Sequence, residues 1–109
     1  AGAKLIVIDP RRIDLVRMPH VEAAHHLALR PGTNVAVLTA MAHTIVTEGL
    51  VDEAFVRDRC EWDAFEDWAQ FVADERHSPE FLEEVTGVPA ADLRAAARLY
   101  ATGGNAAIY

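Results

Sequence analysis

The sequence predicts a helix-rich α/β domain in which helices flank a small, open, mostly parallel sheet. Two short apolar runs, residues 5–8 (LIVI) and 26–29 (HLAL), predict its first two strands. The first run is continuously apolar and rich in β-branched residues, which is typical of a strand buried on both faces of a parallel sheet. Longer segments with apolar residues at helical spacing follow, so helices should outweigh strands.

Proline and glycine mark the ends of both strands. Pro10 ends the first strand because proline has no backbone N–H group to give to a sheet. Residues 11–20 are expected to form a crossover turn or short helix, broken by Pro19. The Pro-Gly pair at residues 31–32 closes the second, weaker strand.

A long helix is predicted directly after the second strand. Thr33 or Asn34 can cap it, because either side chain can satisfy a free N–H group of the first turn, and Gly49 can end it. The expected inward-facing residues are Val35, Leu38, Ala42, Ile45 and Val46, widened by Val37 and Met41. A helix with this much apolar surface should pack against the sheet.

Four further helices and a final strand complete the predicted order. The second helix opens at Asp52, where the helix dipole favours acids, and the third covers residues 62–72. Ser78-Pro79-Glu80 is an N-cap, N1 proline and early acid in sequence, which starts the fourth helix at Phe81; Gly87 ends it, and the fifth follows Pro89. The apolar residues 106–109 then predict the last strand. The expected buried stripe of the fifth helix is Leu93, Ala96, Ala97 and Tyr100.

This order of elements fits a Rossmann-like three-layer fragment. A chain of 109 residues can build one hydrophobic core but is too short for two, so we expect a single α/β domain over residues 1–109. The sequence lacks a starting methionine and stops within an apolar run, so we expect this domain to be a fragment of a larger subunit.

The composition is that of a soluble globular protein, with 51% hydrophobic and 25% charged residues. No stretch approaches the roughly 20 apolar residues needed to cross a bilayer, and no signal peptide is visible. We therefore expect no membrane insertion by this segment and a cytoplasmic location. The net charge of −7 argues against nucleic acid as a partner.

The charge is distributed unevenly. Residues 1–47 carry five basic and three acidic side chains, a net +2, whereas residues 48–92 carry three and fourteen, a net −11. A small phosphate-bearing ligand near the positive part is compatible with this pattern. The alternative is that these arginines only solvate a surface.

Polar side chains follow both predicted strands, at the edge where open α/β sheets bind ligands. Asp9 can accept hydrogen bonds from ribose or guanine, and Arg11 or Arg12 can donate to phosphate. Gly32 allows close approach of the backbone, while Thr33 and Asn34 offer a hydroxyl and an amide at a helix N-terminus. Each group also has a structural alternative, namely an Asx turn with a local ion pair and an ordinary helix cap.

Other chemistry has little support in the sequence. The single cysteine, Cys60, excludes an internal disulfide, and the five histidines lack the spacing of metal ligands. No glycine-flanked serine elbow, Walker loop or Gly-x-Gly-x-x-Gly follows a strand. We therefore expect neither a catalytic residue nor a metal ligand within these residues.

Several stretches occur in the order and spacing of a known family. They are residues 2–12 (GAKLIVIDPRR), 29–34 (LRPGTN), 48–56 (EGLVDEAFV), 85–89 (VTGVP) and 95–101 (AAARLYA). Together they resemble the molybdopterin oxidoreductases, and most of all a segment of formate dehydrogenase catalytic alpha subunits. The resemblance covers essentially the whole chain.

The resemblance implies a parent enzyme with molybdenum or tungsten held by two molybdopterin guanine dinucleotides (bis-MGD). The parent would oxidise formate to carbon dioxide and pass two electrons through iron–sulfur clusters, outside this segment, to electron-transfer subunits. This segment would pack against the rest of the catalytic subunit, hold one guanosine diphosphate arm and be inactive alone. The residues implied to bind that arm are Ile8, Asp9, Pro10, Arg11, Arg12, Gly32, Thr33 and Asn34.

Two departures from the family and three rival interpretations stay open. Many members have aspartate in place of Asn34, and residues 18–25 look longer than usual, which affects the course of the crossover. The rivals are a segment of another molybdopterin oxidoreductase such as a nitrate reductase, a simple nucleotide-binding module with Asp9 on ribose, and a structural interaction domain.

Overall fold

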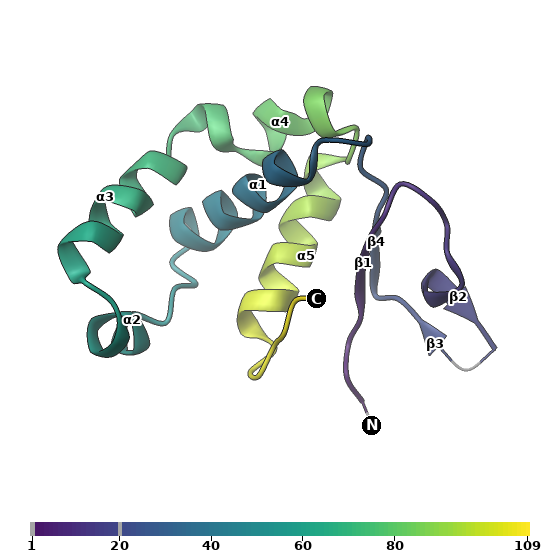
Figure 1. Ribbon diagram of the computed structural model, residues 1–109, viewed down its shortest axis with the longest axis horizontal. Coiled ribbons are helices and arrows are strands. Elements are labelled where there is room, and N and C mark those ends of the chain that lie inside the picture. Colours follow the sequence, from purple (N-terminus) through teal and green to yellow (C-terminus); the bar gives the residue numbers. More distant parts are fainter. Residues whose placement is uncertain (1, 20) are drawn as a thin grey trace.

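The computed structural model describes residues 2–19 and 21–109, and helices dominate it (Figure 1). The helices are α1 (Asn34–Thr47), α2 (Glu53–Arg59), α3 (Trp62–Val72), α4 (Pro79–Thr86) and α5 (Ala90–Thr102). The strands are short: β1 (Ile6–Ile8), β2 (Arg17–Met18), β3 (Val21–Glu22) and β4 (His25–Leu27). Single turns of 3-10 helix occur at Asp14–Val16 and Glu75–His77. No helix in the described ranges is long and apolar enough to cross a bilayer.

The first two predicted strands form a parallel pair, as expected. The register of β1 and β4 pairs Ile6 with His25, Val7 with His26 and Ile8 with Leu27. Because the two strands run in the same direction, their carboxyl ends lie at the same edge of the sheet (Figure 1). This pairing determines where the polar residues that follow each strand can meet.

The crossover between β1 and β4 differs in detail from the expectation of a turn or short helix. It contains a 3-10 turn and a small antiparallel ladder, in which Arg17 of β2 pairs with Glu22 of β3. Pro19 lies between these two strands, where it gives up no ladder hydrogen bond. The predicted break at Pro19 is consistent with this arrangement. The predicted crossover also included His20, which lies outside the described residues.

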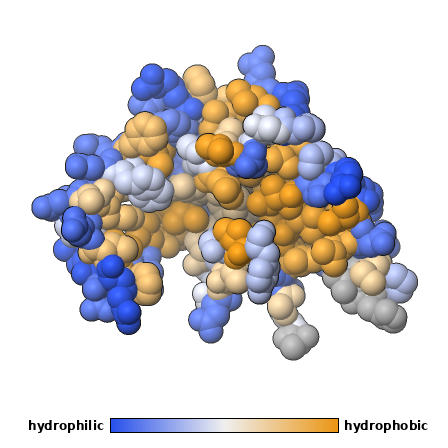
Figure 2. Space-filling model, in the orientation of Figure 1, coloured by the Kyte–Doolittle hydropathy of each residue, from blue (hydrophilic) through white to orange (hydrophobic). Residues whose placement is uncertain are grey.

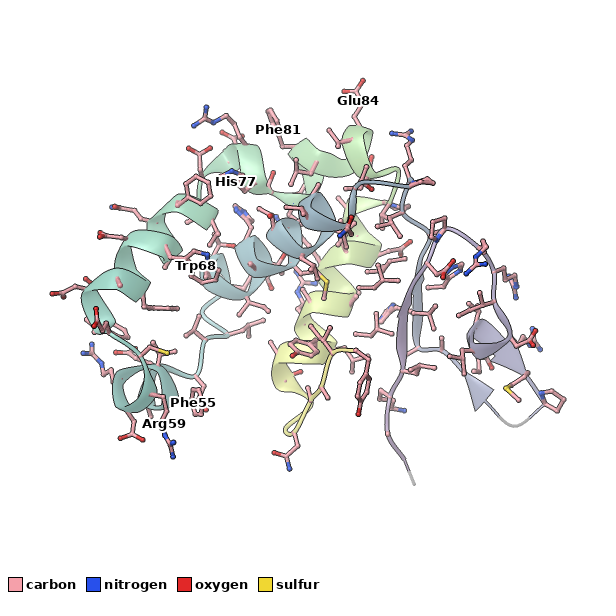
Figure 3. The ribbon with its side chains drawn as sticks, viewed as in Figure 1. Phe55, Arg59, Trp68, His77, Phe81 and Glu84 are labelled. Carbon is pink, nitrogen blue, oxygen red and sulfur yellow. The ribbon has the colours of Figure 1, made fainter. Side chains whose placement is uncertain are left out.

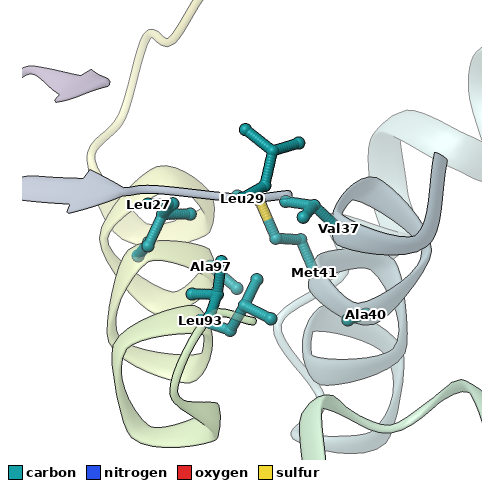
Figure 4. Close-up of a cluster of buried hydrophobic side chains, with 9 residues drawn as sticks. Leu27, Leu29, Val37, Ala40, Met41, Leu93 and Ala97 are labelled. Atoms are coloured by element: carbon teal, nitrogen blue, oxygen red, sulfur yellow. The ribbon is translucent and has the colours of Figure 1, made fainter. Parts of the chain in front are cut away.

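The hydrophobic core lies between β4, α1 and α5 (Figure 4). Leu27 and Leu29 contribute from β4 and the residues that follow it, and Leu93 contributes from α5. The remaining buried members are Val37, Ala40 and Met41 of α1, Val88, and Ala96 and Ala97 of α5. The predicted stripe of α5 is therefore confirmed, with Tyr100 partly buried at its end.

The predicted inward face of α1 is wrong in its first half. Val35 is 72% exposed and Leu38 is also exposed, whereas Val37 and Met41, expected only to widen the stripe, belong to the core. Together with Ala40 they recur three or four residues apart, which is one face of a helix. Because α1 carries apolar residues around most of its circumference, its sequence pattern alone could not select the face that meets β4 and α5.

The predicted last strand is also wrong. Residues 106–109 are exposed and have no strand assignment. A strand requires a hydrogen-bonded neighbour, and the described residues offer this tail none. Since the parallel sheet of the described residues has two strands, a Rossmann-like three-layer arrangement stays a prediction.

The boundaries of α4 follow the predicted local signals. Ser78 caps the helix, with its Oγ accepting a hydrogen bond of 3.1 Å from the backbone N–H of Phe81. Gly87 ends it in the left-handed conformation, with φ of +73°. Ser78 thus fixes the start of α4, and Gly87 fixes its C-terminal end, which lies against Arg30, directly after the core residue Leu29.

Candidate functional site

The candidate site is the edge of the β1–β4 pair at which both strands end. Residues 9–12 follow β1, and residues 30–34 connect β4 to the start of α1 (Figure 1). The parallel register brings these two segments to one edge, as the sequence predicted. The predicted binding residues are thus carried by a turn and a helix N-terminus on the same side of the sheet.

A hydrogen bond between the two strands fixes the first segment. The Nε2 atom of His26 lies 2.9 Å from the backbone carbonyl oxygen of Asp9, and since a carbonyl can only accept, the ring donates. His26 is partly buried, so this bond is shielded from water on one side. His26 was not among the residues that the sequence predicts for this site, and only its expected place on the neighbouring strand could have suggested it.

The first segment forms a compact turn closed by Asp9 and Arg11. The Oδ1 atom of Asp9 accepts from the Arg11 backbone N–H at 2.8 Å and from its Nε at 3.2 Å. The Arg11 side-chain hydrogen bond, and then its backbone N–H, hold the pKa of the Asp9 carboxyl below its usual value. Asp9 is therefore ionised at neutral pH, and the turn is the Asx turn with a local ion pair that was the structural alternative.

The other residues of this turn are accessible. Ile8, Pro10, Arg11 and Arg12 are all exposed at the end of β1. The Arg11 guanidinium therefore lies beside the Asp9 carboxylate, and the exposed Arg12 follows it in the chain, at a surface open to solvent. Such a set can donate to an anionic group and accept from hydroxyl or amide donors.

The second segment leaves the N-terminus of α1 without a side-chain cap. Thr33 stands at the N-cap position, but its Oγ1 donates to the backbone carbonyl of Arg30 at 2.6 Å and makes no cap hydrogen bond within the described chain. The prediction of a side-chain cap is therefore wrong. Asn34, the first residue of α1, is exposed, so the first-turn N–H groups of a fourteen-residue helix face an accessible surface.

Gly32 gives this segment its conformation. Its φ is +83°, a region that residues with a Cβ rarely adopt, and no heavy atom of the described residues lies within 4 Å of the position that a Cβ would occupy. The space beside its backbone is therefore open.

Arg30 anchors the same segment to α4. Its backbone N–H donates to the carbonyl of Thr86 at 2.8 Å, and its guanidinium donates to the carbonyls of Glu84 and Val85. These hydrogen bonds satisfy carbonyl groups at the C-terminal end of α4, and they engage the guanidinium group of Arg30. The cations that remain directed to solvent at this edge are those of Arg11 and Arg12.

The donor set of the edge fits a nucleoside diphosphate. Cations and free helix N–H groups suit phosphate oxygens, while the Asp9 carboxylate and the Asn34 amide suit ribose hydroxyls or guanine N–H groups. By contrast, no group of three His, Cys, Asp or Glu side chains in residues 2–19 and 21–109 is placed to hold a metal ion. The expectation that His20 is not a metal ligand concerns a residue outside these ranges.

Comparisons with known proteins give the chain its relatives. No protein-family model matches it. It is 47% identical over 107 residues to formate dehydrogenase H of Escherichia coli (strain K12), covering 98% of this chain and 14% of that protein. It is 36% identical over 107 residues to F420-dependent formate dehydrogenase 1 subunit alpha of Methanococcus maripaludis, covering 98% and 15%.

A solved structure has the same fold. The structure matches that of acetylene hydratase from Pelobacter acetylenicus with a TM-score of 0.86 at 36% sequence identity, covering 98% of this chain and 14% of that one. The chain is therefore homologous to a short segment of formate dehydrogenase H and related molybdopterin oxidoreductases. Among its relatives are formate dehydrogenase H and a nitrate reductase of Symbiobacterium thermophilum. It spans about one seventh of the length of formate dehydrogenase H.

Proposed function

We propose that this chain is the part of a larger, formate dehydrogenase-like catalytic subunit that binds one guanosine diphosphate arm of a molybdopterin guanine dinucleotide. The main support is the convergence of the Asp9–Arg11 turn and the uncapped start of α1 at one edge of a parallel sheet. The 47% identity to formate dehydrogenase H supports the choice of family member.

Each part of the edge has a distinct role in this proposal. Arg11, Arg12 and the first N–H groups of α1 would bind the diphosphate, because a helix N-terminus and guanidinium groups both favour anions. Asp9 and Asn34 would accept from or donate to the guanosine. Ile8, Pro10, Gly32 and Thr33 would shape the pocket, with the open space at Gly32 allowing close approach of its backbone.

The ion pair between Asp9 and Arg11 keeps the turn ready for this role. The Arg11 side chain is 80% exposed and that of Asp9 is partly exposed. Ion pairs that water can reach are weak, so a phosphate can share or replace the carboxylate as a partner of Arg11. The hydrogen bond from His26 meanwhile holds the backbone of Asp9 in place. The geometry of the turn thus does not depend on the ion pair alone.

The bound cofactor, with molybdenum or tungsten, would supply the two-electron oxidation of formate to carbon dioxide. In this proposal the chain binds and orients one end of that group and performs no bond chemistry. The iron–sulfur clusters, the residues around the metal and the contacts with electron-transfer subunits would lie in other parts of a cytoplasmic parent enzyme, and residues 1–109 alone would be inactive.

The test is cofactor retention in the intact subunit. Replacing Arg11 by alanine, or Asp9 by alanine, should lower the molybdenum or tungsten and pterin content of the purified protein with little change in melting temperature. Arg17→Ala, which removes the same charge from exposed strand β2, is the matched control and should retain the cofactor. Full cofactor content in both site variants would refute the role of this edge.

A nitrate reductase parent is the second candidate, because nitrate reductases of Symbiobacterium thermophilum and Desulfovibrio desulfuricans are 35% and 36% identical to this chain. Turnover of formate and nitrate by the same intact subunit separates the two. For the rival of a simple nucleotide module, a preference for adenine dinucleotides over guanine nucleotides would be the deciding observation.

A further inference from the structure

We propose that an apolar groove on the helical side of the molecule is covered by a segment of the same larger subunit that lies outside these 109 residues. This docking surface is separate from the β1–β4 edge. The inference shares with the proposed function only the premise of a longer polypeptide, and it does not depend on cofactor binding.

The groove lies between α1, α2, α3 and α5 and has a volume of about 720 Å³. Its apolar lining includes Ile45 of α1, Phe55 of α2, Phe65 and Trp68 of α3, and Tyr100 of α5. Residues 104–106, which follow α5, complete one side. Figure 3 shows Phe55 and Trp68 extending from α2 and α3 beside α1. Four helices thus present apolar side chains to one hollow.

Large aromatic side chains in this groove are not buried by the chain itself. Phe55 is 59% exposed and Trp68 is 47% exposed, although both line the hollow. Of the apolar positions of α3, only Val72 is buried among the described residues. In Figure 2, hydrophobic side chains lie in the hollow between the α2–α3 end and the centre of the molecule, with hydrophilic side chains around that end.

The total surface is too large for a free-standing domain of this size. The accessible area is 7488 Å² for a mass of 11.9 kDa, whereas surface scaling gives about 5900 Å² for a monomeric protein of that mass. The radius of gyration is 14.6 Å, against about 13 Å for a compact domain of this length. The excess of about 1500 Å² is roughly twice what one partner buries in a standard interface.

The relatives indicate which partner covers this surface. The chain matches 98% of its own length within a polypeptide of which it forms only 14%, so most of such a protein lies outside these residues. A segment of the same polypeptide is held near the groove at a high effective concentration, which favours it over any separate molecule.

Charge argues against a second copy as the occupant. Residues 48–92, which include α2 and α3, carry a net −11, and Asp52 lies in the groove itself. A two-fold dimer through this face would bring like charges together. The occupant that fits is an apolar segment flanked by lysine or arginine.

Hydroxyl-radical footprinting of the unaltered, intact subunit tests this without any mutation. If the groove is covered, Phe55 should fall from 59% exposure to the level of core side chains such as Met41 at 6%, and its oxidation should be about tenfold slower than in the urea-unfolded subunit. Trp68 should be protected as well. Oxidation of both at the unfolded rate would overturn the inference.

Photo-crosslinking then identifies the occupant. With Phe55→p-benzoylphenylalanine in the intact subunit, the expected product is a link to a peptide of the same polypeptide outside residues 1–109. A link between two copies, or to a separate subunit, would overturn the inference. The control is the same replacement at Phe81, a similarly exposed aromatic on α4 outside the groove, and equal yields at both positions would overturn the assignment to this groove.

The two proposals fail separately. Protection of Phe55 combined with full cofactor content in the Arg11 and Asp9 variants would uphold the docking surface and refute the cofactor role. Loss of cofactor in those variants combined with a solvent-exposed Phe55 would do the reverse.

Discussion

His26 donates a hydrogen bond of 2.9 Å from its Nε2 atom to the backbone carbonyl of Asp9, and so ties the residue that follows β1 to the neighbouring strand β4. The two residues are 17 positions apart in the sequence. The bond leaves the carboxylate of Asp9 free to accept from Arg11, so backbone and side chain of one residue are fixed by different partners.

Replacing His26 by leucine should lower the free energy of unfolding by about 1 kcal/mol, because the partly buried Asp9 carbonyl loses its donor. His26→Gln should retain most of the stability, since the glutamine amide can donate over a similar reach. Urea denaturation of both variants measures this. Equal losses in the two variants would show that ring packing, and not the hydrogen bond, is what matters at this position.

The two valines at the start of α1 provide a matched test of the face that this helix buries. Val37→Ala should cost about 2 kcal/mol, because it leaves a cavity in the core beside β4. Val35→Ala should change stability by less than about 0.5 kcal/mol, since that side chain is exposed. Chemical denaturation of the two variants compares the same substitution in the same helix. A larger loss at Val35 would restore the face expected from sequence.

Local signals explain why much of the fold could be predicted. The run before Pro10, the Ser78 cap and the left-handed Gly87 each act through neighbours in sequence, and all three are seen in the structure. The convergence of Asp9 and Gly32 at one edge followed from the rule that parallel strands end on the same side.

The features that could not be predicted depend on distant partners. The buried face of α1 is selected by β4 and α5, the hydrogen bond of His26 needs the register of two strands, and the last strand lacks a neighbour. Thr33 is a different case, because its hydroxyl could either accept from a first-turn N–H group of α1 or donate to a nearby carbonyl. In the structure it donates to the carbonyl of Arg30. In such cases the sequence indicates which hydrogen bonds a side chain can make, but it does not indicate which of them forms.

Gly87 and Gly32 offer a second matched pair, because both have positive φ but different surroundings. Gly32→Ala should cost about 1 kcal/mol from backbone strain alone. Gly87→Ala should cost roughly 1 kcal/mol more, since the new Cβ would lie 3.3 Å from the Arg30 side chain, whose hydrogen bonds to the end of α4 must then shift.

Thermal or urea unfolding of both glycine variants, with and without Arg30→Ala, measures this coupling. In the Arg30→Ala background the loss at Gly87 should shrink to that at Gly32. An unchanged difference between the two glycines in that background would mean that Arg30 is not the cause.

A four-residue ion-pair network joins α4 and α5 to the end of α1. Arg94 donates to both carboxylate oxygens of Glu80, at 2.7 and 2.8 Å, and to Glu48 at 3.0 Å. Arg98 donates to both oxygens of Glu48, at 2.6 and 2.9 Å. The network connects the helices that enclose the core, so its protonation should affect the stability of the fold.

The pH dependence of stability should come in part from Glu80. The Arg94 hydrogen bonds lower the pKa of Glu80 from 4.5 to about 2, and those of Arg98 lower the pKa of Glu48. Below about pH 4.5 the unfolded chain therefore binds protons that the folded chain does not, so stability is fully present above that pH and is lost as the pH falls toward 2.

Urea midpoints measured between about pH 5 and pH 2 should consequently fall less steeply for Glu80→Gln than for the unaltered chain, because the variant has no carboxylate at this position to protonate. Glu84→Gln, the same change of charge on the same helix, should retain the original slope. Arg94→Gln should also flatten the slope, since without its partner Glu80 loses the main cause of its low pKa. Identical slopes for the unaltered chain, Glu80→Gln and Arg94→Gln would show that this network does not contribute to folding stability in acid.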